Sequence, residues 1–513
     1  MQSKESCTDQ SPRAKEFLDR YPEYASTTLL DDLRATEYSF LDENNHIYLD
    51  YTGAGLAAHS QHEAHRQRLR HGAFGNPHSV NPTSQATTDL VEETRSRILR
   101  YFSASADEYT VIFTPNATGA ARLVGESYPW RRGARLVLTA DNHNSLNGLR
   151  EFARRGNSRT VYVPVDGDEL RTWEADVVAA LEGSRCSPAD WLAAKGFAGG
   201  ARGRRRGLFA YPAQSNFTGV RHPLSWVGLA QDRGYDVLLD AAAYLPTATL
   251  DLSSSSGGPR PDFVTVSWYK VFGAPTGVGC LVARREALAR LRRPWFAGGT
   301  VRAATTGSGR RAWHVPEDGA AAFEDGTVDF LSIPDVAVGL DWVARVGGPD
   351  VVATRVRCLT GWLLDELRAL RHGDGGGGMV VVYGPVGVWG RGGTVCFNVL
   401  DRDGVVFDER LVAAESSAAG ISLRTGCFCN PGAGAAALGI TPAVLDRVGR
   451  ARAESNGDLE GALDGLGLTI GAIRVSLGIA SVLADVEALV AFVEATYRDR
   501  VATTKNLPPR GKC

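Results

Sequence analysis

The sequence lacks the features that mark secreted, membrane and nucleic-acid-binding proteins. Only 8 of its 513 residues are cysteine, and they are scattered, which is too sparse for a disulfide scaffold and is typical of a reducing compartment. No apolar run is long enough to span a bilayer, and the polar N-terminus has no signal-peptide core. The formal net charge is only −2, so charge favours neither nucleic acid nor an anionic membrane as a partner. We therefore expect a soluble cytoplasmic protein.

What is present is ordinary for a globular protein that is large enough for two domains. The chain is 43% hydrophobic and 22% charged, and its length exceeds what one small core needs. One basic cluster, Arg202–Arg206, is interpreted as a solvated loop ahead of a strand. We expect an N-terminal arm at residues 1–45, a large domain at 46–335, a small α+β domain at 336–500 and a loose tail at 501–513.

Short apolar runs alternate with segments of helical spacing between residues 110 and 283. Since these runs are apolar on both faces, they predict strands that are covered by helices on each side. The seven runs are Thr110–Thr114, Arg135–Thr139, Thr160–Val163, Gly207–Tyr211, Tyr235–Asp240, Phe263–Ser267 and Val278–Ala283. The alternation predicts an α/β fold with a mainly parallel seven-stranded sheet. In the small domain, strands are expected at Met379–Tyr383, Val395–Leu400 and Ala472–Ser476.

A lysine follows one of these strands, in the stretch Ser267–Gly277. If burial and its neighbours lower its pKa, Lys270 can hold a carbonyl cofactor as a Schiff base. The alternative is a lysine at a strand end that points into water. The strand end at Phe113–Ala120 turns into a helix start, where the backbone around Ala117 and the Thr118 hydroxyl can bind a phosphate. An ordinary helix cap is the alternative there.

Three more polar side chains follow predicted strands. His143 can lie over a planar heterocycle, or it is a structural histidine. Asp240 ends a strand, and a buried carboxylate needs a cationic partner such as a protonated pyridine nitrogen; the alternative is a helix cap. Asn216 supplies an amide at the same edge. Ligands bind at the carboxyl ends of strands in open α/β sheets, and Asp240 precedes Lys270 by 30 residues, one crossover unit. Together these residues favour pyridoxal phosphate.

Seven motifs in order resemble a known family. They are DNHNS, PAQSNFTG, LLDAAAYLPT, SWYKVFGAPTGVG, FEDGTVDF, RTGCFCNPGAG and GAIRVSLG, beginning at residues 141, 212, 238, 267, 323, 424 and 471. The set resembles the cysteine-desulfurase-like domain of eukaryotic molybdenum cofactor sulfurases, within the class V aminotransferase group of fold-type I pyridoxal phosphate enzymes. The resemblance extends from about residue 40 to 500.

The resemblance implies a role for each matching residue. Lys270 would carry the cofactor, Asp240 would pair with its ring nitrogen, His143 would stack on its ring and Asn216 would bond its phenolic oxygen. Ala117, Thr118 and Ser267 would hold its phosphate, and Arg474 would pair with the substrate carboxylate. Thr327 resembles the residue that reaches the cofactor phosphate of a partner subunit, which implies a homodimer.

The loop that begins at Arg424 resembles the R-T-G-x-x-C loop of cysteine desulfurases, and Cys429 matches its sulfur-accepting cysteine. A thiolate there would take sulfur from the substrate as a persulfide. The alternatives are a buried structural thiol or half of a zinc site. A lone C-x-C without further Cys or His pairs argues against zinc, so no metal is expected. The role of Cys427 stays open.

The sequence departs from the family at Ala243 and Tyr269, where bacterial cysteine desulfurases carry Gln and His. The chain also ends where full-length family members continue into a domain that binds the molybdenum cofactor. We expect a desulfurase that takes sulfur from L-cysteine as a Cys429 persulfide, releases alanine and passes sulfur to a separate acceptor. The alternative is a C–S lyase that performs β-elimination on a specialised cysteine derivative. A scaffold without activity is a third reading, and the joint presence of Lys270, Asp240 and His143 argues against it.

Overall fold

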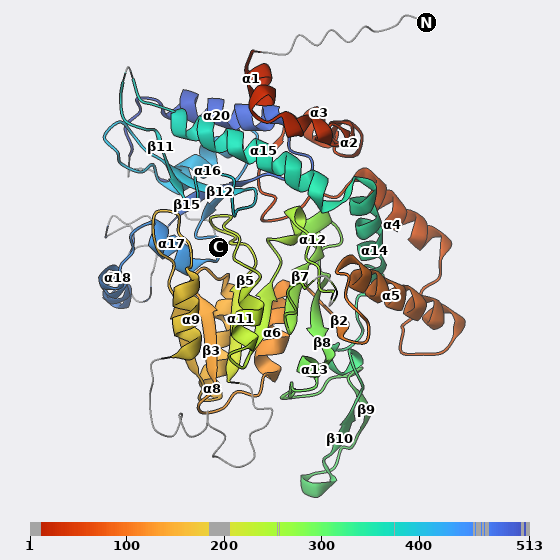
Figure 1. Cartoon of the computed structure of the whole chain (residues 1–513). Helices are drawn as coiled ribbons and strands as arrows, with labels where there is room; N and C mark the ends of the chain where they lie inside the picture. Colours follow the sequence, from red (N-terminus) through yellow and green to blue (C-terminus); the bar gives the residue numbers. More distant parts are fainter. Residues whose placement is uncertain are drawn as a thin grey trace, which may run out of the picture.

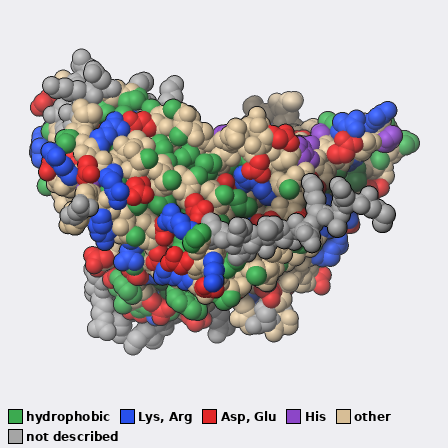
Figure 2. Space-filling view, turned by 90° about the horizontal axis from the view of Figure 1, so that it is seen from above, with side chains coloured by type: hydrophobic (Ala, Val, Ile, Leu, Met, Phe, Trp, Pro, Cys, Tyr) green, Lys and Arg blue, Asp and Glu red, His purple; other side chains and the backbone are tan. Residues whose placement is uncertain are grey.

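The computed structural model describes residues 12–183 and 206–513, except 254, 256, 374, 455–456, 458–462, 464–465, 467–470, 504–506 and 509–513. The basic cluster at 202–206 lies outside the described residues apart from Arg206, and the expected tail at 501–513 is described only in part. None of the described helices combines the length and the apolar character that crossing a membrane requires. On the face shown in Figure 2, basic and acidic side chains are interspersed.

A seven-stranded sheet forms the centre of the large domain. Its strands are β2 (Tyr109–Thr114), β3 (Arg135–Thr139), β4 (Arg159–Val163), β5 (Gly207–Pro212), β6 (Tyr235–Asp240), β7 (Phe263–Ser267) and β8 (Gly279–Arg284). They lie in the order β2-β8-β7-β6-β5-β3-β4, and all run parallel except β8, which is antiparallel to both of its neighbours. The seven predicted strands are confirmed to within one residue at each end.

Both faces of this sheet are covered by helices, as the apolar runs predict. Along β5, Leu208 and Ala210 face one hydrophobic core, while Phe209 and Tyr211 face another. The first core is completed by α6 (Ala117–Ser127) and α8 (Leu149–Arg155). The second takes residues from α5 (Pro82–Tyr101), α9 (Glu174–Glu182), α11 (Trp226–Gln231) and α14 (Ile333–Arg345). The sheet is therefore the middle layer of three (Figure 1).

A smaller lobe contains an antiparallel four-stranded sheet in the order β11-β12-β15-β14. Its strands are β11 (Val380–Tyr383), β12 (Thr394–Val399), β14 (Arg424–Gly426) and β15 (Ala472–Ser476). The helices α15 (Gly348–Ala369), α16 (Glu409–Ala418) and α20 (Leu483–Tyr497) pack against this sheet around a third core. In Figure 1 this lobe lies above the large sheet, over the end of the sheet where β5 and β6 finish.

The N-terminal arm packs against both domains. It consists of α1 (Pro12–Arg20), the 3₁₀ turn η1 (Pro22–Thr27), α2 (Leu29–Glu37) and α3 (Phe40–Glu43). Phe17 belongs to the small-lobe core, and Leu30 belongs to a core of the large domain. Helix α14 crosses the expected division at 335/336, and its buried side chains pack into the large domain. The division into residues 46–335 and 336–500 stays a prediction.

Further elements connect these layers. They are α4 (His59–His71), α7 (Asn144–Asn147), α12 (Trp268–Phe272), α13 (Arg285–Leu288), α17 (Pro431–Ala437), α18 (Pro442–Glu454), the parallel pair β1 (Ile47–Tyr48) and β13 (Ile421–Ser422), the hairpin β9 (Val301–Ala304) and β10 (His314–Pro316), and the 3₁₀ turns η2 (Leu245–Thr247), η3 (Gly309–Arg311) and η4 (Ala321–Phe323). The β9–β10 hairpin extends away from the body of the molecule, at the end of the large sheet opposite the small lobe (Figure 1).

Candidate active site

A cavity of about 120 Å³ lies at the carboxyl ends of the large-domain strands. Seven of the ten residues that the sequence predicts for the site line this cavity: Ala117, Thr118, His143, Asn216, Asp240, Ser267 and Lys270. They come from five different strand ends, so the parallel topology brings together side chains that are far apart in sequence. Three predicted residues, Thr327, Cys429 and Arg474, are not among its lining residues.

Lys270 lies in the first turn after β7, on α12. Burial lowers the pKa of its amine, while the nearby Asp240 carboxylate acts in the opposite direction. Its ammonium has no hydrogen-bond or ion-pair partner among the described residues. A lysine in this state is available as a neutral nucleophile closer to neutral pH than an exposed lysine is.

Asp240 faces the same cavity from the end of β6 and is 8% exposed. Its Oδ1 atom accepts hydrogen bonds from the Ala242 backbone N–H at 3.0 Å and from the Thr265 hydroxyl at 3.1 Å. Its Oδ2 atom has no partner within the described part of the chain. A buried carboxylate with one unpaired oxygen at a cavity fits the cationic ring nitrogen of pyridoxal phosphate.

The phosphate end of the predicted site is the start of α6. The Ala117 N–H donates to the Ser267 hydroxyl at 2.9 Å, so this amide already has a partner. The Thr118 hydroxyl lies 2.7 Å from the hydroxyl of Ser145, a residue that the sequence did not single out. Two hydroxyls at the positive end of an eleven-residue helix suit a phosphate.

His143 caps α7 and is held in one tautomer. Its Nδ1 atom accepts a hydrogen bond from the Ser145 backbone N–H at 3.1 Å, which assigns the ring proton to Nε2. Burial, followed by the charge of Lys270, lowers the pKa of this imidazole. The ring is therefore neutral near pH 7, as a ring that stacks on an aromatic cofactor requires.

Arg474 lies on β15, opposite Arg424 of β14, and both contact Asp50. The Nη2 atom of Arg474 donates to Asp50 Oδ1 at 2.8 Å, and the Nε atom of Arg424 donates to Asp50 Oδ2 at 3.0 Å. Burial lowers the pKa of Arg474, and Asp50 opposes this effect. Two guanidiniums that share one carboxylate leave one positive charge uncompensated, and the buried Arg474 Nε has no partner in the described structure. This cluster can attract an anionic substrate group.

The loop that carries Cys427 and Cys429 follows β14 and is tied to the large domain. The Asn144 N–H donates to the Cys429 carbonyl at 2.7 Å, and the Asn216 amide donates to the Phe428 carbonyl at 2.7 Å. Both cysteines are partly exposed. The Asn216 side chain thus serves the loop as well as the cavity, and its predicted bond to the phenolic oxygen stays a prediction.

Thr327 is exposed and lies outside the cavity of its own chain. Its hydroxyl accepts a hydrogen bond from the Asn76 amide at 3.2 Å. The sequence places this residue in the site of a partner subunit, which stays a prediction.

Sequence reasoning missed two residues that contact predicted site residues: Asp50, which pairs with Arg474, and Asn430, which bonds Asn216. Asp50 follows β1, and a side chain at Gly53 would begin 2.4 Å from its carboxylate. An Asp-x-x-Gly turn beside a strand end was the available signal. Asn430 is buried and contacts Asn216, and nothing in its local sequence sets it apart from an ordinary helix cap. Within the described residues, no group of three or more His, Cys, Asp or Glu side chains is arranged to hold a metal ion.

The chain belongs to the class-V aminotransferase family, whose model matches residues 47–182 and 202–489. Within that family it is similar to molybdenum cofactor sulfurases. It is 35% identical to the Bos taurus protein over 487 residues, which cover 91% of this chain and 52% of the relative. It is 36% identical to the Homo sapiens protein over 484 residues, which cover 90% and 51%. The chain thus spans about half the length of these curated relatives.

Solved structures show the same fold. A cysteine desulfurase from Thermococcus onnurineus matches with a TM-score of 0.69 at 22% identity, over 91% of this chain and 98% of that one. A cysteine desulfurase from Escherichia coli matches with a TM-score of 0.64 at 20% identity, over 91% and 98%. A third structure, with a TM-score of 0.61 at 17% identity, covers 90% of this chain and 98% of its own and has glycine linked to its pyridoxal phosphate. Fold and family confirm the predicted fold class and indicate pyridoxal phosphate as the cofactor.

Proposed function

We propose that this protein is a pyridoxal phosphate-dependent, cysteine desulfurase-like sulfurtransferase that acts on L-cysteine. The observation that carries the proposal is the buried Lys270, with its lowered pKa, beside the half-paired Asp240 carboxylate. Lys270 and Asp240 would hold the two ends of the cofactor ring, His143 would cover it, and Thr118, Ser145 and Ser267 would surround the phosphate. The bound cofactor supplies an electron sink for the α-carbon of an amino acid.

The side chains of this protein would then bind the substrate and move its protons. The spare positive charge of the cluster of Arg474, Arg424 and Asp50 would bind the substrate carboxylate. The amine of Lys270, whose pKa is lowered by burial, would accept the α-proton at Nζ and return a proton when the product leaves.

Sulfur transfer would occur at Cys429. Its Sγ atom attacks the substrate sulfur, an S–S bond forms and the substrate C–S bond breaks. The electron pair of that bond ends on the substrate carbon, which gains a proton as alanine forms. Cysteine and the Cys429 thiol thus become alanine and a Cys429 persulfide, with no external oxidant. A separate thiol acceptor would take the sulfur.

One observation favours the alternative, a C–S lyase that releases pyruvate and ammonia. Neither Cys429 nor Arg474 lines the cavity that holds Lys270, whereas Ala243 and Tyr269, the two departures from the family, do line it. A β-elimination needs the lysine and the cofactor but no acceptor thiol.

Product analysis with L-cysteine separates the two reactions. We expect alanine from the wild-type protein in a one-to-one ratio with transferred sulfur. The Cys429→Ala variant should keep the yellow cofactor and lose sulfur transfer by at least about 100-fold, because a nucleophile is removed. Cys427→Ala, two residues away on the same loop, is the matched control. Alanine release by Cys429→Ala at the wild-type rate would disprove the persulfide step, and pyruvate from the wild type would establish the lyase.

The protein is further proposed to act as a homodimer in the cytoplasm. A reducing compartment is supported by the free thiols of Cys280, Cys358, Cys396 and Cys429. The dimer is supported by the β9–β10 hairpin and the segment before it, which expose Trp295, Phe296 and Trp313 to between 45% and 53%. Large exposed apolar side chains on a projecting arm are typical of an interaction surface.

A further inference from the structure

Asp141 is a completely buried carboxylate that the proposed reaction does not use. It follows β3, two residues before His143. Its Oδ1 atom accepts hydrogen bonds from the Ser215 hydroxyl at 2.8 Å and from the Asn430 amide at 2.7 Å, and its Oδ2 atom lies 3.1 Å from His222 Nε2. Of these three partners, only Asn430 comes from the small lobe. A buried carboxylate requires such donors, because an unpaired charge away from water is costly.

Asn430 is also completely buried, and every polar atom of its side chain is used. Its Nδ2 atom donates to Asp141 and, at 3.0 Å, to Asn216 Oδ1. Its Oδ1 atom accepts from the Ala433 N–H at 3.2 Å and thereby caps α17. One amide therefore connects the cysteine loop to two strand ends of the large domain and starts the helix that follows.

The neighbouring backbone is under strain that these contacts must offset. Phe428 and Cys429 both have φ of +53°, in the left-handed region, which is unfavourable for a residue with a side chain. The Phe428 ring packs against Phe217 and under the Arg474 guanidinium. At Gly432 a side chain would begin 2.2 Å from the Ala140 carbonyl, so the loop backbone touches the end of β3.

We propose that Asp141 and Asn430 form a latch that holds the loop of residues 427–432 against the carboxyl ends of β3 and β5. Both are positioning residues: neither lines the cavity that holds Lys270, and they act through Cys429. This inference rests on the proposed function only in taking Cys429 as the sulfur carrier. The latch fixes the Cys429 backbone beside Asn144, the residue after His143, and thereby restricts the movement of a thiol that is partly exposed.

The decisive variant is Asn430→Asp in the holoenzyme. Aspartate keeps the size and the capping oxygen but loses the amide donor and sets a second carboxylate against Asp141. We expect iodoacetamide to alkylate Cys429 at least about tenfold faster than in the wild type, because the loss of a charge-assisted hydrogen bond releases the loop. We also expect kcat for sulfur transfer to fall at least about tenfold, while KM for L-cysteine changes less than about twofold.

Asn398→Asp is the matched control, because Asn398 is equally buried in the same lobe and its amide bonds Tyr383 and the Gly471 carbonyl instead. A general loosening of the lobe would speed alkylation in both variants and would overturn the proposal, as would an unchanged alkylation rate in Asn430→Asp. If Asn430→Asp does not fold, Asn430→Ser keeps the cap, adds no charge and should still speed alkylation. Mass mapping separates Cys429 from Cys427, and the alkylation rate needs no turnover, so it tests the latch even if the proposed reaction is wrong.

Discussion

At the scale of single residues, Asp50 determines the charge on the substrate side of the site. Its carboxylate is shared by Arg474 and Arg424, and the side chain of Arg474 is only 3% exposed. If Asp50 becomes neutral, two guanidiniums face each other across neighbouring strands with no counter-charge. Asp50 therefore holds Arg474 in place and leaves one positive charge for the proposed substrate carboxylate.

We predict that Asp50→Asn lowers the free energy of unfolding by about 3 kcal/mol, since removing one partner of a buried ion pair leaves the other charge buried without a counter-charge. Urea unfolding at neutral pH measures this change. Asp42→Asn is the control: Asp42 is exposed and pairs with Arg34, which keeps Asp485 as a second partner, so its loss should cost less than about 1 kcal/mol. Equal losses in the two variants would mean that the Asp50 ion pairs contribute no more to the free energy of unfolding than the exposed Asp42 pair does.

His143 gives the site a dependence on pH whose sign follows from its lowered pKa. Between the folded pKa and the ordinary value near 6.5, the unfolded chain binds more protons than the folded protein. The stability that His143 confers is thus present above pH 6.5 and is lost as pH falls through that value toward the folded pKa. We predict that the stability advantage of the wild type over His143→Gln shrinks from about pH 8 to pH 5, as measured by urea unfolding at each pH. A constant difference would contradict the neutral imidazole.

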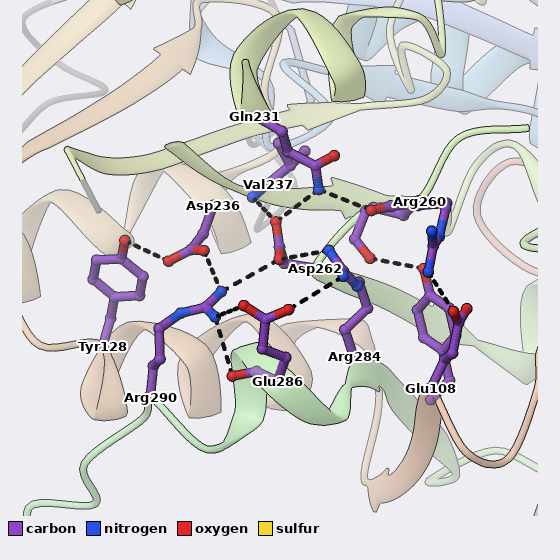
Figure 3. A network of polar contacts seen from close by, with 12 residues as sticks. Glu108, Tyr128, Gln231, Asp236, Val237, Arg260, Asp262, Arg284, Glu286 and Arg290 are labelled. Carbon is purple, nitrogen blue, oxygen red and sulfur yellow. Dashed lines mark hydrogen bonds and ion pairs between the residues drawn. The ribbon is translucent and has the colours of Figure 1, made fainter. Parts of the chain in front are cut away.

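At the scale of elements, the large sheet has different polar clusters at its two ends. The carboxyl ends carry the candidate site, whereas the opposite ends of β6 and β7 carry the polar network in Figure 3. There the Oδ2 atom of Asp262 accepts from the Val237 N–H at 2.9 Å and from Gln231 at 3.0 Å, and its Oδ1 atom faces Arg284 and Arg290. Asp262 is completely buried, so the network joins β6, β8 and the segment before β7 at the end of the sheet opposite the cavity.

We predict that Asp262→Asn destabilises the protein by about 3 kcal/mol, because Arg290 and Arg284 lose a buried counter-charge. The absorbance of the bound cofactor per folded molecule should stay unchanged, because the network lies at the other end of the strands from Lys270. Denaturant unfolding gives the first quantity and spectroscopy of the folded fraction gives the second. Loss of cofactor binding at full folding would mean that the two ends of the sheet are coupled.

The difference between local sequence patterns and contacts between distant residues explains what the sequence could predict. Strands such as Phe263–Ser267 were predictable because burial on both faces requires a continuous apolar run. The positions of Lys270 and Asp240 at the cavity were predictable because Asp240 ends such a run and Lys270 follows one in the next turn. Asp50 and Asn430 act through contacts with residues more than 200 positions away, with Arg424 and Arg474 and with Asp141 and Asn216. No local pattern encodes such pairings, since they depend on how the small lobe lies on the large sheet.

At the scale of the whole molecule, three predicted residues lie outside the cavity of their own chain, and the sequence assigns one of them, Thr327, to the site of a partner subunit. Thr327 lies outside the cavity, on a loop where the Gly326 N–H donates to the Gly298 carbonyl, close to the start of the β9–β10 hairpin. Exposed tryptophans flank this region at positions 295 and 313. A second copy that covers the hairpin would be related to the first by a two-fold axis. In such an interface the same residues of both chains make the same contacts, so each chain would contribute its Thr327 loop to the other.

If each chain completes the site of the other, two inactive variants should restore activity in a hybrid dimer, which monomers cannot do. Lys270→Ala removes the cofactor lysine, and Thr327→Glu sets a carboxylate where the phosphate of the partner's cofactor would lie, so each variant alone should be inactive. In a hybrid dimer, the site that keeps Lys270 receives the intact Thr327 from the other chain. Equal mixing after reversible dissociation yields hybrids in half of the dimers, each with one good site, so activity should return to about a quarter of the wild-type value. Lys270→Ala mixed with itself is the control, and an unrestored mixture that light scattering shows to be dimeric would mean that Thr327 serves its own chain or no cofactor at all.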